Sequence, residues 1–83
     1  MVVKAYILVT LTPGSERKVC RKIAENEEVV EVSELYGEYD ALLQVRVSNL
    51  RELDTFITDK IRSLPDVYLT STMIVAKQYK GDR

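Results

Sequence analysis

The sequence predicts one α+β domain in which strands and helices follow one another in the order βαββαβ. Three observations carry this prediction. The chain of 83 residues is long enough for one hydrophobic core and too short for two. Four segments alternate apolar and polar residues as β-strands do, and two segments between them carry apolar residues at helical spacing. We therefore expect residues 1–83 to fold as a single domain.

The first half of the chain predicts a strand, a helix and a hairpin. Residues 3–11 are rich in β-branched residues and stop at a Pro-Gly pair, which predicts a strand whose odd positions are all apolar. From Ser15 to about Asn26 the apolar residues lie on one helical stripe, and Thr12 or Ser15 can cap this helix. Residues 29–36 and 39–47 then read as two strands joined by a turn at Gly37.

The second half predicts a helix and a last strand. Asn49 and Glu52 have the spacing of a capping box, and Pro65 ends the helix that they open. The last strand runs from Val67 to about Tyr79. We expect one side of it to carry Val67, Leu69, Met73 and Val75.

This order of elements is the ferredoxin-like pattern, with both helices on one face of a four-stranded antiparallel sheet. The other face is then open, and it is more apolar than a solvent-exposed sheet should be. We expect it to carry Tyr6, Leu8, Thr10, Leu42, Gln44, Arg46, Thr72 and Ile74. The chain should therefore dimerise through this face and form a dimeric α/β barrel, unless these are only scattered surface hydrophobes.

The composition excludes several kinds of site. The chain has no histidine, which rules out catalytic triads and imidazole metal sites. Cys20 is the only cysteine, so neither an internal disulfide nor a thiolate metal cluster can form, and its place on the apolar stripe makes it a core residue. We expect no catalytic residues, no metal and no cofactor.

Charge and hydropathy limit the partners. With 12 basic and 13 acidic residues the net charge is −1, so the chain has no excess of positive charge with which to hold duplex DNA. The longest apolar run, Ala5–Val9, is far shorter than the roughly 20 residues that span a bilayer. No signal peptide is visible at the N-terminus. We expect a cytoplasmic protein that binds neither DNA nor a membrane.

Two short segments could bind a ligand. In Gly37-Glu38-Tyr39-Asp40, glycine lets a ligand approach the backbone, and the aspartate can pair with an ammonium group. In Thr70-Ser71-Thr72, three hydroxyls can donate to a carboxylate. Each segment also has a purely structural interpretation, as turn chemistry in the first and as ordinary strand residues in the second.

Together these segments resemble the effector-binding domain of the Lrp/AsnC family of transcriptional regulators, also called the RAM domain. The resemblance lies in a G-x-Y-D segment at residues 37–40, a capped helix, an L-P-x-V segment at 64–67 and a T-x-T-x-I-V segment at 70–75. It covers almost the whole chain. Family members are usually about twice this length and begin with a helix-turn-helix, so the chain looks like a stand-alone RAM protein.

The resemblance implies a function and a site. It implies subunits that dimerise through their sheets and assemble into rings, commonly octamers, with an amino-acid effector at the contacts between dimers. Carried onto this chain, the effector-binding residues are Gly37, Tyr39, Asp40, Thr70, Ser71 and Thr72. Asp40 would pair with the effector's ammonium group, and Glu38 could select its side chain. Partners could include full-length regulators of the same family.

Three alternatives stay open. Small cofactor-poor monooxygenases use the same dimeric barrel, although no acid-base constellation is visible here. ACT-type regulatory modules share the βαββαβ order and bind amino acids beside the loop after the first strand, which is Thr12–Ser15 in this chain. A purely structural oligomer that has lost its ligand is the third alternative.

Overall fold

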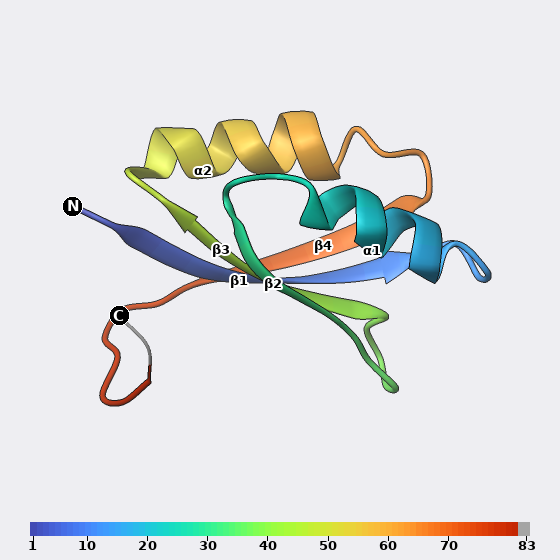
Figure 1. Ribbon diagram of the computed structural model, residues 1–83, viewed down its shortest axis with the longest axis horizontal. Helices are drawn as coiled ribbons and strands as arrows, with labels where there is room; N and C mark the ends of the chain where they lie inside the picture. The colour runs from blue at the N-terminus through green and yellow to red at the C-terminus, as the bar shows by residue number, and fades with distance from the viewer. Residues whose placement is uncertain (82–83) are drawn as a thin grey trace.

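The computed structural model describes residues 1–81 and confirms the βαββαβ order. The elements are β1 (Val3–Leu11), α1 (Glu16–Ala24), β2 (Val29–Glu34), β3 (Ala41–Val47), α2 (Leu50–Phe56), the π-helix η1 (Ile57–Ile61) and β4 (Val67–Ile74). The strands form one antiparallel sheet in the order β2-β3-β1-β4. The helices lie together on one side of this sheet, as Figure 1 shows, so the predicted ferredoxin-like fold is confirmed.

The hydrophobic core fills the space between the helices and the two central strands. Side chains of β1 and β3 alternate between buried and half-buried positions, as expected for strands with only one covered face. The largest side chains that are fully buried are Ile7, Val9, Ile23, Leu43, Val45 and Ile61. Cys20 is partly buried and packs against this core, in agreement with its predicted place on the apolar stripe.

The helix ends follow local hydrogen bonds. Asn49 caps α2 as predicted, because its side chain accepts a 2.8 Å hydrogen bond from the backbone of Glu52. Ser15 is the N-cap residue of α1, but its hydroxyl donates to the carbonyl of Thr12 and does not cap the helix. The second helix continues beyond α2 as η1, where the Arg62 amide donates to the Ile57 carbonyl.

Three predicted strand ends were wrong. Strand β2 stops at Glu34 and β3 begins at Ala41, because the Leu35 amide donates to the Asp40 carbonyl and closes residues 35–40 into a loop. Strand β4 ends at Ile74 and not near Tyr79, because the chain bends away from β1 after the Val75 amide donates to the Lys4 carbonyl.

The predicted faces of β4 were also wrong. A bulge places Thr10 opposite Leu69 but Leu11 opposite Val67, so the strand changes its alternation there. Thr72 and Ile74 consequently oppose Ile7 and Ala5 and lie on the helix side of the sheet. The residues of β4 on the open face are Leu69, Ser71 and Met73, beside Tyr6, Leu8, Thr10, Leu42, Gln44 and Arg46 of β1 and β3. The open face thus stays rich in apolar residues, with a different contribution from β4.

Within residues 1–81, no helix is both long enough and apolar enough to cross a membrane.

Candidate functional site

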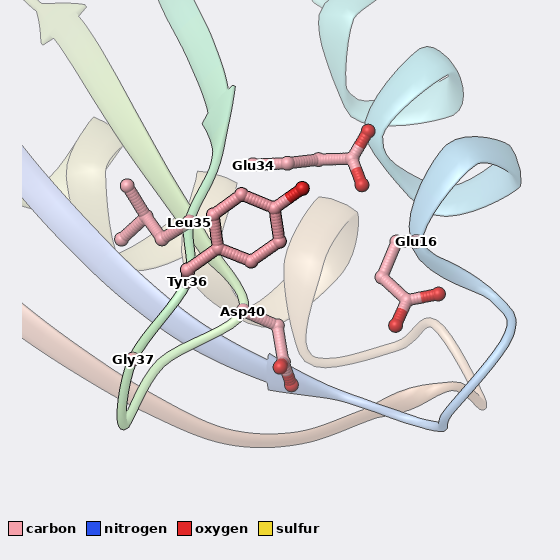
Figure 2. Close-up of a pocket in the computed structure, with 6 residues that line it drawn as sticks. All are labelled: Glu16, Glu34, Leu35, Tyr36, Gly37 and Asp40. Atoms are coloured by element: carbon pink, nitrogen blue, oxygen red, sulfur yellow. The ribbon is translucent and has the colours of Figure 1, made fainter.

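A hollow of about 480 Å³ lies between the β2–β3 loop and the start of α1. Its lining consists of Glu16, Glu34, Leu35, Tyr36, Gly37 and Asp40. Figure 2 shows the Glu34 side chain extending toward α1, the Tyr36 ring beside it, and the Asp40 carboxylate pointing toward the end of β1. The hollow is therefore built by the loop that contains the G-x-Y-D segment, and it carries three carboxylates.

The Asp40 side chain is held by the end of β1. Its Oδ2 accepts a 2.6 Å hydrogen bond from the Leu11 amide. The Asp40 amide donates a 2.9 Å hydrogen bond to the Val9 carbonyl. The Asp40 carbonyl accepts a 2.9 Å hydrogen bond from the Leu35 amide. These bonds fix the carboxylate at the rim of the hollow, and they leave it further lone pairs with which to accept hydrogen bonds from a ligand.

The loop that carries Asp40 depends on Gly37. Its φ is +154°, a positive value that residues with a side chain rarely adopt. The neighbouring Tyr36 projects from the loop and is fully exposed, with 109% relative accessibility. The loop thus presents an aromatic ring and a bare stretch of backbone next to the three carboxylates.

The carboxylates of the hollow affect the pKa of Cys20 in α1. Burial raises the pKa of the Cys20 thiol, and the negative charges of Glu34 and Glu16 raise it further. The folded thiol therefore holds its proton more tightly than the unfolded thiol does. The resulting contribution to stability is complete below the unfolded pKa and is lost as the pH rises through the folded pKa.

We expect Glu34→Gln to make Cys20 more reactive. Removing this negative charge lowers the pKa of the thiol and increases the thiolate fraction at mildly alkaline pH, so alkylation by iodoacetamide should be faster. The rate can be followed by mass spectrometry of the folded protein. The matched control is Glu38→Gln in the same loop, since Glu38 contributes nothing to the pKa shift of Cys20. Equal rates for both variants would contradict this account of the hollow.

The structure brings only part of the predicted site together. Gly37 and Asp40 line the hollow, whereas Tyr39 is half-buried in the same loop and is not among the lining residues. Residues 70–72 lie on β4, which β1 separates from β3: Val9 of β1 opposes Ala41 on one side and Thr70 on the other. Within one chain the hydroxyl segment is thus about 10 Å, or two strand spacings, from the loop.

Four lining residues were missing from the predicted site: Glu16, Glu34, Leu35 and Tyr36. Glu16 looked like one of several charged residues outside the apolar stripe of its helix, and nothing in the sequence indicated that the loop folds toward it. One signal was available. Residues 23–45 contain seven carboxylates and no Lys or Arg, which indicates a negatively charged surface around the loop.

No group of three or more His, Cys, Asp or Glu residues among residues 1–81 is arranged to hold a metal ion. A small ferredoxin-like domain with an acidic hollow beside a glycine loop is suited to bind a small ligand.

The chain belongs to the Lrp/AsnC family. The family model described as the Lrp/AsnC ligand binding domain matches residues 4–83. Curated relatives include the HTH-type transcriptional regulator FL11 of Pyrococcus horikoshii, 42% identical over 76 residues that cover 92% of this chain and 50% of the relative. The FL11 protein of Pyrococcus abyssi is 40% identical over 76 residues, which also cover 92% of this chain and 50% of that relative. The chain thus spans about half the length of these relatives.

Solved structures agree with this assignment. The hypothetical protein PHS023 from Pyrococcus horikoshii has a TM-score of 0.86 and 43% identity, and the match covers 93% of each chain. A transcriptional regulator of Neisseria meningitidis in complex with L-Met has a TM-score of 0.87 and 25% identity, over 95% of this chain and 53% of that one. The Escherichia coli AsnC structure, with a TM-score of 0.90 and 21% identity over 98% of this chain and 55% of its own, supports the fold alone.

These relatives define the class of function. The FL11 proteins and the Neisseria meningitidis protein are transcriptional regulators, and the family model that matches this chain describes a ligand binding domain. The comparisons thus support a regulatory effector-binding role for this domain and not the monooxygenase alternative.

Proposed function

We propose that the chain senses a free amino acid and binds it in the hollow at residues 34–40. The observation that carries this proposal is that Asp40 and Gly37 of the G-x-Y-D segment line a hollow with two further carboxylates, Glu16 and Glu34. A negatively charged hollow suits the ammonium group of an amino acid. The L-Met complex of the Neisseria meningitidis regulator supports the choice of ligand class.

Each predicted site residue has a proposed role. Asp40 pairs with the ammonium group, and the backbone around Gly37 contacts the ligand carboxylate, with Tyr39 helping to shape the loop. Because Thr70, Ser71 and Thr72 lie across β1 from this loop, their hydroxyls serve a site that is shared between copies of the chain. Glu38 is exposed beside the hollow and selects the side chain of the ligand.

We propose that assembly is the output of the sensor. The open sheet face joins two copies in a dimeric α/β barrel, and dimers form an octamer or a similar ring with effectors at their contacts. An effector shifts this assembly only by its higher affinity for the assembled state. Full-length regulators of the same family are candidate partners in the cytoplasm, and the chain acts without contacting DNA itself.

A thermal-shift screen against the twenty amino acids tests the proposal. A ligand present at about 100 times its Kd should add roughly 2.7 kcal/mol to the stability of each site. Since the hollow carries three carboxylates, we expect amino acids with cationic side chains to give the largest shifts and acidic ones the smallest. The control is the Nα-acetyl derivative of the best ligand, which lacks the α-ammonium group. An equal shift with that derivative, or no shift with any amino acid, would contradict the proposal.

A further inference from the structure

Four basic side chains lie close together on the outer side of α1. Residues 17–22 contain two Arg, two Lys and no carboxylate, although the net charge of the whole chain is −1. Arg17 and Arg21 are four positions apart and are therefore neighbours on the helix surface. Lys18 and Lys22 form a second such pair beside them. All four are exposed, because α1 buries its opposite side in the core. These four residues form the basic face of α1.

Most charges of the basic face have no partner within the chain. Lys18 forms an ion pair with Asp66 at 3.3 Å. In the described part of the chain, Arg17, Arg21 and Lys22 form no ion pair. The basic face lines a shallow depression of about 480 Å³. Three cations at one place are thus available to a negatively charged partner.

A groove with apolar side chains lies directly beside the basic face, between α1 and β2. Its volume is about 340 Å³. Cys20 and Val32 of the groove are half-buried and pack against the core, and Ala24 beside them is exposed. Arg17 and Arg21 line the same groove and connect it to the basic face. Positive charge and a small apolar surface are therefore combined in one place.

We propose that this groove and the basic face of α1 dock a segment of another protein in which acidic residues flank an aliphatic side chain. The aliphatic side chain enters the groove, and the removal of apolar surface from water holds it there. The flanking carboxylates accept charge-assisted hydrogen bonds from the guanidinium groups of Arg17 and Arg21. Glu34, which also lines the groove, repels carboxylates from the β2 side and so sets the orientation of the segment.

The form of this surface favours a protein segment over nucleic acid or a membrane. The four bases span six residues of one helix, whereas a duplex gains its affinity from phosphates that recur about every 1.7 Å along its axis. Glu16 and Glu25 border the bases and would repel further phosphates. An anionic membrane takes up apolar side chains from a basic helix, but Val19 and Ile23 of α1 are buried in the core.

Fluorescence anisotropy without added amino acids tests the docking. The probe is a fluorescein-labelled peptide of about 15 residues that repeats Glu-Glu-Leu. We expect saturable binding at about 50 mM NaCl that weakens by about tenfold or more at about 500 mM NaCl, because salt screens exposed ion pairs. A matched peptide with Ser in place of Leu keeps the charge and should bind about tenfold more weakly. No binding of the Leu peptide, or equal binding of the Ser peptide, would overturn the proposal.

Two variants at exposed positions locate the bound peptide. Arg17→Gln/Arg21→Gln removes the two guanidinium groups and should weaken binding by about tenfold. Ala24→Glu places a carboxylate in the groove and should abolish binding. The matched control is Lys60→Gln/Arg62→Gln, which removes two exposed positive charges from the other helical segment and should leave binding unchanged. An equal loss in this control, or no loss in the α1 variants, would contradict the proposal.

The thiol of Cys20 reports on the groove directly. Because Cys20 lines the groove, a saturating amount of the Leu peptide should slow its alkylation by iodoacetamide. An unchanged rate would place the peptide elsewhere and refute the docking. Tighter binding of a DNA duplex of about 20 base pairs through Arg17 and Arg21 would also refute it. So would a mass in sedimentation velocity, without peptide, that falls in Arg17→Gln/Arg21→Gln, because the occupant would then be a second copy. These experiments use neither Gly37 nor Asp40, so their failure leaves the proposed function standing.

Discussion

Replacing Asp40 should abolish amino-acid binding, and two substitutions separate its charge from its structural hydrogen bond. Asp40→Asn keeps an oxygen that can accept from the Leu11 amide but removes the negative charge that holds the ammonium group. Titration calorimetry of this variant should show no binding of the ligand identified by the thermal-shift screen, while its melting temperature without ligand stays near that of the unchanged protein. Unchanged affinity would remove Asp40 from the site.

Asp40→Ala should lose both functions of the side chain. Without an acceptor at this position the Leu11 amide loses its 2.6 Å hydrogen bond, which costs about 1–3 kcal/mol of stability if the group stays buried. The end of β1 and the loop at residues 35–40 are then no longer tied together. Urea denaturation should therefore find Asp40→Ala less stable than Asp40→Asn, and equal stabilities would contradict a structural role for this carboxylate.

The largest loss of stability is expected from Leu43→Ala. Leu43 lies in the central strand β3 and is completely buried, so truncation removes buried apolar area and leaves a cavity, at a cost of about 2–5 kcal/mol. A domain of this size has roughly 4–12 kcal/mol of stability in total. Urea denaturation followed by circular dichroism should show a large decrease in the midpoint or a chain that is already unfolded.

The matched control is another leucine on the surface. Leu50 begins α2 and is 59% exposed, so Leu50→Ala should change stability by no more than about 0.5 kcal/mol. If the two variants were equally stable, the arrangement of the core around β3 would be wrong.

The fold could be predicted because its periodic patterns are strong. The odd positions of residues 3–11 are apolar throughout and face the core in the structure, and the Asn49 cap forms as its spacing indicates. The faces of β4 could not be predicted. The bulge opposite Thr10 and Leu11 depends on how two strands meet, and one extra residue moves every later side chain to the other face.

The site could be predicted only in part for a similar reason. Gly37 and Asp40 lie three positions apart in one recognisable sequence pattern, so they were found. Glu16 reaches the same hollow from α1, and only the packing of α1 against β2 brings it there. The hydroxyls of residues 70–72 stay apart from the hollow in one chain, and the role that we propose for them requires contacts with another copy.

A crystal structure grown with the amino acid that gives the largest thermal shift tests the central claim most directly. The account predicts electron density for the ligand beside Gly37 and Asp40, with its ammonium group within hydrogen-bond distance of the Asp40 carboxylate. Density beside Gly14, in the loop after β1, would contradict it and would support an ACT-like mode of binding. Density at neither loop would refute the assignment of this hollow as the effector site.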